Sequence, residues 1–129
     1  AESAVVALEQ LGARVAVAVR DPAKAARSGA FGPDTDLLPL GEAGPVLAAS
    51  DVVVATIPPR TEFALEVPSL ERAQTLLDVA YEPWPTPLAT AWEAAGGTVV
   101  HGLRMLLHQA VHQVRIFVAG DPSVPLPDE

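Results

Sequence analysis

Four short stretches of this sequence carry side chains that could bind a ligand, and each follows an apolar run. They are "RDPAK" (20–24), "ATIPP" (55–59), "YEPWPTP" (81–87) and "HGLRMLLHQAVHQ" (101–113). Their chemistry suits phosphates, hydroxyl groups and flat rings. If the apolar runs are strands, the four stretches are strand ends, and their common position becomes the first question.

The first stretch offers positive charge. Arg20 and Lys24 lie one helical turn apart and could clamp a phosphate, and a guanidinium plane can also stack on adenine. Asp21 lies between them, and an acidic residue at this place in a dinucleotide fold usually holds a ribose instead. The plain alternative is a solvated Arg and Lys, with Asp21 as a helix cap. The spacing alone leaves both open.

The second and third stretches could each form one wall of a ligand-binding site. Thr56 and Ile57 would lie near a ribose or ring edge, although a purely structural turn explains them equally well. Tyr81 follows the next strand, and its hydroxyl can donate or accept. The prolines after it restrict the backbone to extended geometry. The alternative here is a rigid turn with Trp84 and Trp92 packed as core.

The fourth stretch begins at Gly102, which allows close approach to the backbone. Met105, His108, Gln109 and His112 share one face of the predicted helix. Two histidines one turn apart can chelate zinc, but no third ligand is evident, so we expect no metal site. Gln109 interrupts an apolar helix, and a buried amide would need polar partners such as a polyol.

The elements that would position these residues alternate between strands and helices. We expect strands at 14–20, 36–40, 51–57, 74–80 and 98–102, and helices at 4–11, 21–29, 42–50, 87–95 and 103–118. The last helix would direct its apolar side chains towards a core: Leu103, Leu106, Leu107, Ala110, Val114 and Phe117. Such alternation predicts a parallel sheet covered on both faces, with ligands at the carboxyl ends of its strands.

Composition limits the classes of function. The chain has 129 residues, 50% apolar and 19% charged, as expected of one globular domain. It has no cysteine, so disulfides and thiolate metal sites are excluded. A net charge of −8 argues against nucleic-acid partners and anionic membrane surfaces. No apolar run approaches the ~20 residues of a spanning helix. The expected location of the protein is the cytoplasm. The Pro-rich, acidic residues 121–129 are expected to be a disordered tail.

The segment "LLDVAYEPWPTPLATAWEAAGGTVVHGLRMLLHQAVHQ" closely resembles the C-terminal region of bacterial shikimate dehydrogenases. That family has Asp-x-x-Tyr at a strand end, a Thr-Pro-Leu loop, and then Gly-Leu-x-Met-Leu-x-x-Gln. The matching residues are Asp78, Tyr81, Pro83, Thr86, Pro87, Leu88, Gly96, Gly102, Leu103, Met105, Leu106 and Gln109. "AVVALEQLGA", "VAVRDPAKA" and "SDVVVATIPP" precede them in the expected order.

The resemblance implies that residues 1–120 form a partial NAD(P)-binding Rossmann domain, a three-layer αβα fold with a mostly parallel sheet. It implies reduction of 3-dehydroshikimate to shikimate with NADPH, in the pathway to chorismate and the aromatic amino acids. It assigns cofactor contacts to Arg20, Lys24, Thr56, Ile57, Gly102 and Met105, and substrate contacts to Tyr81 and Gln109. It assigns no catalytic residue here, because the family's catalytic Lys and Asp belong to an N-terminal substrate domain that this sequence does not contain.

Three departures keep other interpretations open. The family's usual Asn is Val19 here, its Thr is Asp21, and a second Asn is Ala55. Asp21 leaves NADP and NAD both possible as cofactor. Shikimate and quinate are both possible as substrate, because the residues that choose between them lie mostly in the substrate domain. The losses at Val19 and Ala55 favour an alternative, a non-catalytic Rossmann-like module that binds a nucleotide or partner for regulation. A homodimer is possible.

The central strand of the sheet, and the glycine-rich loop after it, have no counterpart in the sequence. The strand would lie between those at 14–20 and 51–57. We therefore expect one of three outcomes: residues outside this sequence supply the strand, another copy fills its place, or the two flanking strands pair directly.

Overall fold

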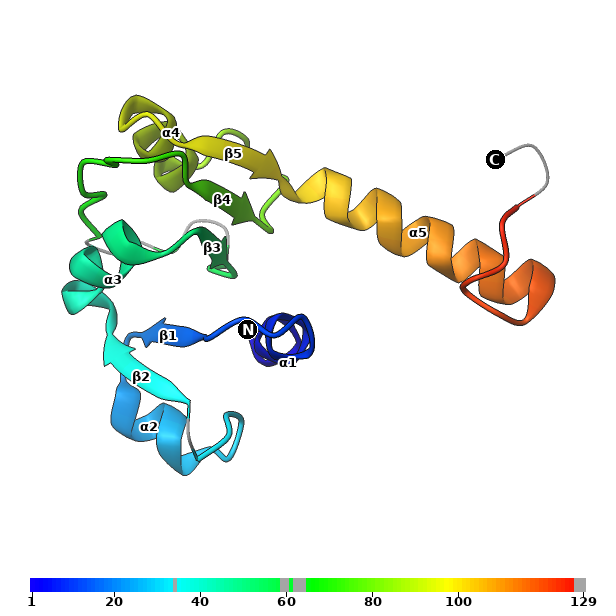
Figure 1. Cartoon of the computed structure of the whole chain (residues 1–129), viewed down its shortest axis with the longest axis horizontal. Coiled ribbons are helices and arrows are strands. Elements are labelled where there is room, and N and C mark those ends of the chain that lie inside the picture. Colours follow the sequence, from blue (N-terminus) through cyan, green and yellow to red (C-terminus); the bar gives the residue numbers. More distant parts are fainter. Residues whose placement is uncertain (34, 59–60, 62–64, 127–129) are drawn as a thin grey trace.

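The computed structural model describes residues 1–33, 35–58, 61 and 65–126 (Figure 1). The elements, in chain order, are α1 (Glu2–Gln10), β1 (Ala16–Val19), α2 (Pro22–Arg27), β2 (Asp36–Pro39), the 3₁₀ turn η1 (Leu40–Glu42), α3 (Gly44–Ala49), β3 (Val52–Ala55), β4 (Thr75–Asp78), α4 (Pro87–Ala94), β5 (Thr98–His101) and α5 (Gly102–Ala119). Every predicted helix and strand is confirmed, with three of the five strands one or two residues shorter at each end. The expected turn at 58–63 lies largely outside the described residues.

Capping residues set the helix boundaries. The Asp21 side chain accepts from the Lys24 N–H at 2.9 Å, and Pro22 occupies the first turn, so α2 begins where the sequence predicted. Its end is followed by Gly29 at φ +67°, a conformation that suits glycine. Thr86 caps α4 in the same way by accepting from the Ala89 N–H at 3.0 Å.

The strands form two parallel sheets instead of one. β1 pairs with β2, and β3, β4 and β5 form the second sheet in that order. The two groups are separate in Figure 1, so of the three expected outcomes the direct pairing of 14–20 with 51–57 does not occur. The order β2-β1, then a gap, then β3-β4-β5 is that of a Rossmann sheet without its central strand. The predicted α/β fold is therefore confirmed, together with the vacant centre.

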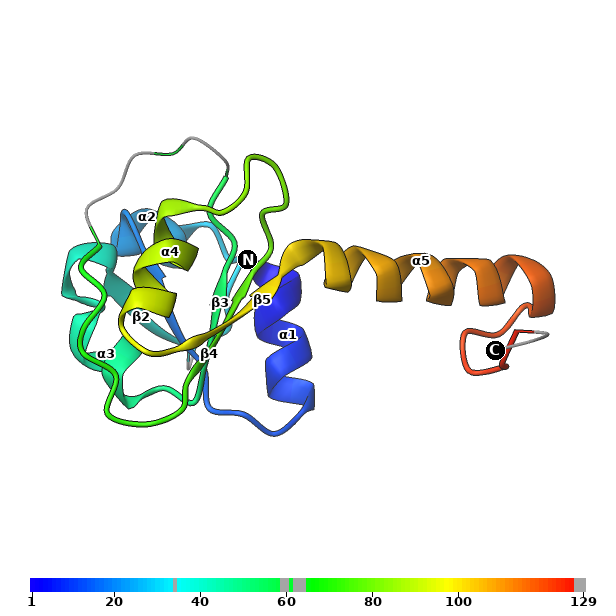
Figure 2. The same ribbon diagram turned by 90° about the horizontal axis from the view of Figure 1, so that it is seen from above.

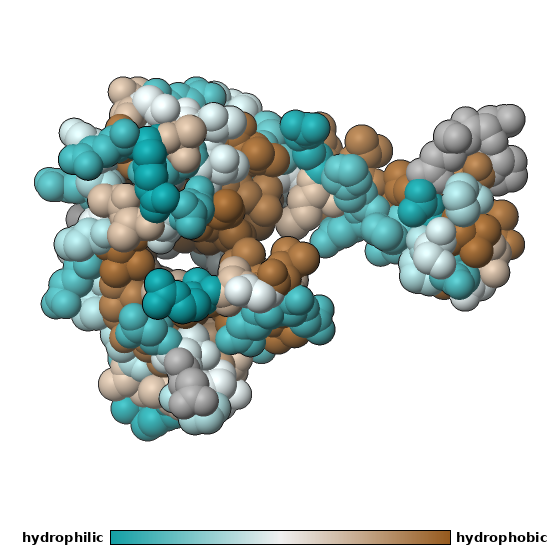
Figure 3. Space-filling view, in the orientation of Figure 1, coloured by the Kyte–Doolittle hydropathy of each residue, from teal (hydrophilic) through white to brown (hydrophobic). Residues whose placement is uncertain are grey.

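A cleft of about 1790 Å³ lies between the two sheets. Its walls include Val17 and Val19 of β1 and Val53 of β3, and hydrophobic surface gathers around the hollow between the two halves in Figure 3. Within the described part of the chain, the facing edges of β1 and β3 pair with no further strand. An edge of this kind is a template for another strand.

One core nevertheless joins both halves. The buried residues Ala43, Leu47, Ala55, Leu76, Leu88 and Trp92 form it, with Trp92 fully buried. Ala18 and Leu38 of the small sheet and Val53 and Val99 of the large one pack against this cluster. Ala43 and the helix α3 therefore connect two sheets that share no strand pairing.

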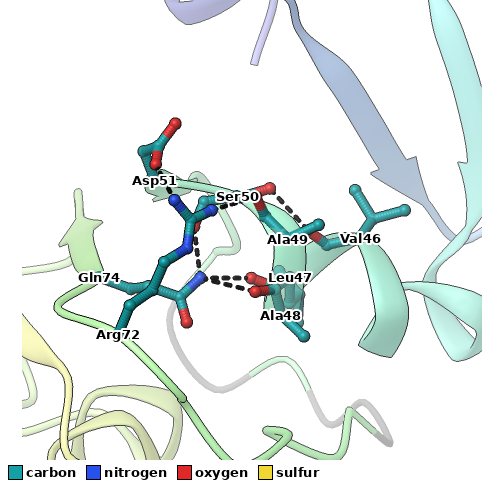
Figure 4. Close-up of polar contacts among 8 residues, drawn as sticks. All are labelled: Val46, Leu47, Ala48, Ala49, Ser50, Asp51, Arg72 and Gln74. Carbon is teal, nitrogen blue, oxygen red and sulfur yellow. Dashed lines mark hydrogen bonds and ion pairs between the residues drawn. The ribbon is translucent and has the colours of Figure 1, made fainter.

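The carboxyl end of α3 is closed by side chains from the segment before β4 (Figure 4). Gln74 Nε2 donates to the carbonyls of Leu47 at 2.9 Å and Ala48 at 3.2 Å, and also to that of Ser50. Arg72 pairs with Asp51 and donates to the Ala49 carbonyl. Because the last carbonyls of a helix have no partner within the helix, Gln74, itself buried, satisfies groups that would otherwise lack donors.

Replacing Gln74 with leucine is expected to lower the free energy of unfolding by about 1–3 kcal/mol, the cost of leaving buried acceptors unsatisfied. Urea denaturation measures the change. Gln10→Leu, at an exposed position of α1, is the matched control and should change stability by less than about 0.5 kcal/mol. Equal stabilities of the two variants would contradict the capping role.

The helix α5 corrects one prediction. It begins at β5 and projects away from the rest of the molecule in Figures 1 and 2. Leu103, Leu107 and Val114 are exposed, and Phe117 is 88% exposed, so these side chains face no core formed by the described residues. The periodicity located the apolar face correctly, but it holds no information on what covers that face. Among the described helices none is long and apolar enough to cross a membrane.

The chain after α5 turns at Gly120, and Asp121 accepts from the Ser123 hydroxyl at 2.7 Å and its N–H at 2.8 Å. These bonds lower the pKa of the Asp121 carboxyl, the side-chain bond most. Residues 127–129 lie outside the described part of the chain, and disorder of 121–129 stays a prediction.

Candidate functional site

The ends of β1 and β3 meet at one cleft although the strands belong to different sheets. Arg20 and Lys24, after β1, line the cleft between the sheets together with Thr56 and Ile57, after β3. Arg20 and Lys24 are exposed, and within the described residues neither side chain is engaged in an ion pair. Two cations therefore stand at one side of an apolar cleft.

The carboxyl group of Asp21 is directed to its own helix. It accepts from the backbone N–H of Lys24, which is the cap described above. The sequence allowed either a ribose ligand or a cap, and the structure shows the cap. The negative charge next to Arg20 is thereby held at the start of α2.

A second, smaller pocket adjoins the first. Its volume is about 440 Å³, and it is lined by Thr56, Ile57, Pro58, Val79, Ala80, Tyr81 and Glu82. Thr56, Ile57 and Pro58 line both, so the cleft with the cations and the pocket that Tyr81 borders share one wall. Tyr81 itself is 54% exposed, which leaves its hydroxyl accessible to a ligand.

Gly102 lies against the end of β4. A Cβ atom at this position would lie 2.4 Å from the Val79 carbonyl oxygen and 2.8 Å from that of Asp78. The close approach that the sequence predicted for Gly102 is thus made, in this structure, by the neighbouring strand. It brings the first turn of α5 next to the pocket that Val79 and Tyr81 line.

Replacing Gly102 with alanine is expected to cost about 1–3 kcal/mol of stability, because the clashing atoms are backbone and cannot rotate away. Thermal unfolding measures the loss, and hydrogen exchange at 102–106 should rise as the start of α5 shifts. Gly41→Ala is the matched control, since a methyl group on Gly41 would meet no atom within 4 Å. If both variants unfold at the same temperature, the close packing is wrong.

The remaining predicted residues lie along α5. Met105 is half-buried in its first turn, whereas Gln109 is exposed, so no described residue of this chain buries its amide and its contact with substrate stays a prediction. Gln109 lies about 10 Å along the helix from Gly102, and it lines neither pocket. His108 and His112 are exposed, and no group of three or more His, Asp or Glu that could hold a metal occurs among the described residues.

Two contacts were not predicted. Asp78, at the end of β4 and 3% exposed, accepts from the Ala80 N–H at 3.1 Å and from the Thr86 hydroxyl. The rings of Trp84 and His101 lie with centroids 3.9 Å apart. The motif Asp-x-x-Tyr…Thr-Pro was a signal from which the first contact could have been predicted. Nothing in the sequence indicated the contact between Trp84 and His101.

Comparison with known proteins agrees with this geometry. A solved structure of Mycobacterium tuberculosis shikimate dehydrogenase is 38% identical and superposes with a TM-score of 0.70 over 98% of this chain. A shikimate 5-dehydrogenase from Mycobacterium fortuitum is 36% identical, also with a TM-score of 0.70. A curated shikimate dehydrogenase (NADP(+)) from Methanocella arvoryzae is 33% identical over 96% of this chain. The chain belongs to the shikimate dehydrogenase family.

Membership is limited in extent. The chain spans about half the length of the shikimate dehydrogenases it matches, 49% of both the Methanocella and the M. tuberculosis proteins and 47% of the M. fortuitum protein. A quinate/shikimate dehydrogenase (NAD(+)) from Corynebacterium glutamicum is 38% identical over 61% of this chain, so relatives with either cofactor name occur. No family model matches the sequence.

Proposed function

We propose that this chain forms the nicotinamide-cofactor part of an NADP-dependent shikimate dehydrogenase. The observation that carries the proposal is that the cleft lined by Arg20 and Lys24 and the pocket lined by Tyr81 adjoin at a shared wall, Thr56 to Pro58. The cofactor, when bound, supplies the hydride that reduces the ketone of 3-dehydroshikimate in the pathway to chorismate. The chain's own residues bind and orient; we assign none of them a proton-transfer role.

The residues present fit the adenosine end of NADP. Arg20 and Lys24 are cations at the end of β1 without an ion-pair partner among the described residues, and such a pair can neutralise a 2′-phosphate. Asp21 caps α2 instead of facing a ribose, which favours NADP over NAD. Gly102 and Met105, at the start of α5, would lie beside the nicotinamide. Thr56 and Ile57 would contact the middle of the cofactor, between its adenosine and nicotinamide ends.

Tyr81 is the substrate contact that the geometry supports best, because it lines the smaller pocket that adjoins the cleft. Gln109 is exposed on α5, and its contact with substrate would need a partner surface on that helix. The exposed apolar face of α5 is a surface on which a substrate domain could close.

The proposal also accounts for the cleft between the two sheets, which a further strand would fill. We infer that one parallel strand, followed by a phosphate-binding turn, fills the space between β1 and β3 in the whole enzyme. The unpaired edges of both strands and the apolar walls support this inference. The relatives are about twice as long as the matched region, which leaves ample length for a strand and a second domain.

The test uses a protein of full family length that contains this chain. The rate of shikimate oxidation is measured from the absorbance of the reduced nicotinamide. We expect this rate to be higher with NADP⁺ than with NAD⁺. Nucleotide binding without turnover of shikimate or quinate would instead support the non-catalytic module, for which Val19 and Ala55 are the sequence features. A preference for NAD⁺ with quinate would support the enzyme activity named for the Corynebacterium relative.

A further inference from the structure

The loop between β4 and α4 touches the start of α5 through two aromatic rings. The Trp84 and His101 centroids are 3.9 Å apart, with the ring planes inclined by 50°. Trp84 is 36% exposed, whereas Trp92 is fully buried in the core. Trp84 therefore contributes little to the core, and its contact with His101 lies at the surface.

His101 is held in place by a second interaction. Its Nδ1 accepts from the Leu103 N–H at 2.9 Å and so caps α5. His101 is also the register partner of Asp78, at which the loop begins. The imidazole ring is thus a fixed platform beside the root of the loop.

The loop is consequently attached at two places. Asp78 binds the Ala80 N–H and the Thr86 hydroxyl and so closes its base, while Trp84 rests on His101 further along. Tyr81 lies between these attachments and borders the 440 Å³ pocket. Any shift of Trp84 away from His101 would move the Tyr81 wall relative to the first turn of α5.

We propose that Trp84 and His101 are positioning residues that set the distance between the Tyr81 loop and the amino end of α5. This inference rests on the proposed function, in which substrate and nicotinamide meet between those two elements. The two residues act through Tyr81 and Gly102 and need not touch substrate. A tilted contact between two aromatic rings contributes about 0.5–1.5 kcal/mol, which is enough to bias one arrangement of the loop.

Four variants of the full-length enzyme separate positioning from mere stability. Trp84→Phe keeps an aromatic ring, and Trp84→Leu removes it. His101→Asn removes the imidazole but keeps a strong helix-capping side chain. The double variant Trp84→Leu/His101→Asn completes a cycle that isolates the contact itself.

We expect Trp84→Leu and His101→Asn each to raise KM for shikimate about three- to tenfold, with kcat and the melting temperature changed far less. The double variant should resemble either single variant, and Trp84→Phe should stay within about twofold of the parent. Unchanged KM in both single variants, or effects that multiply in the double variant, would overturn the proposal.

Hydrogen exchange keeps this proposal separable from the proposed function. Exchange of the backbone amides at 79–86 should rise in Trp84→Leu and His101→Asn, while that of α4 stays unchanged. If the parent enzyme lacks turnover, the proposed function fails, and loop exchange still decides the contact. Unaltered exchange at 79–86 would show that the two rings do not hold the loop.

Discussion

Replacing Asp78 with alanine is expected to lower the free energy of unfolding by about 3–5 kcal/mol, the sum of two hydrogen bonds to a buried carboxylate. The variant would leave the Ala80 N–H and the Thr86 hydroxyl without their acceptor at a position only 3% exposed. Thr86 also caps α4, so the loss would spread to that helix. Urea denaturation followed by circular dichroism measures the change.

Two further variants define the origin of this loss. Asp78→Asn keeps one carbonyl acceptor for Ala80 but offers an amide to the Thr86 hydroxyl, so a smaller loss is expected. Asp36→Ala removes a carboxylate from an exposed position at the start of β2, and it should change stability by less than about 0.5 kcal/mol. Equal effects of Asp78→Ala and Asp36→Ala would show that the bonds at Asp78 do not hold the loop.

In the full-length enzyme, Arg20→Ala is expected to weaken NADP⁺ binding about 10- to 100-fold and NAD⁺ binding by less than about threefold. The loss corresponds to charge-assisted hydrogen bonds to a phosphate group that only NADP⁺ carries. Calorimetric titration with each cofactor gives both dissociation constants. The change in preference is more informative than either constant alone, because general damage would weaken both cofactors.

Arg27→Ala is the matched control for Arg20→Ala. It removes the same charge from the last turn of α2, and Arg27 is exposed and outside the cleft. Its effect on both cofactors should be less than about twofold. Similar losses for the two arginine variants would indicate a general effect of net charge. Equal weakening of NADP⁺ and NAD⁺ by Arg20→Ala would place the 2′-phosphate elsewhere.

The helices and strands could be predicted because their signals are local. Asp21, Pro22 and Gly29 mark both ends of α2, and the β-branched runs mark β1 and β3. The vacant centre of the sheet could also be predicted, since the order of motifs left one strand without residues. Whether β1 and β3 would close on each other could not, because it depends on how α3 and the shared core hold the two sheets apart.

Contacts between distant residues were the least predictable. Sequence spacing placed Arg20, Thr56 and Tyr81 at strand ends, but the two adjoining pockets that they line depend on twist and packing. The amphipathic pattern of α5 suggested burial, yet Gln109 and Phe117 are exposed. A helix pattern shows which face is apolar but does not specify what packs against that face. The Trp84–His101 pair depends on how one loop folds over β5, which no local pattern encodes.

The most direct test of a single nucleotide site shared by the two sheets is an NMR titration of the ¹⁵N-labelled full-length protein with NADP⁺. We predict that the amides of Arg20, Thr56, Ile57 and Gly102 shift together, with one dissociation constant. Shifts on only one side of the gap between β1 and β3, or none at these four residues, would contradict the account.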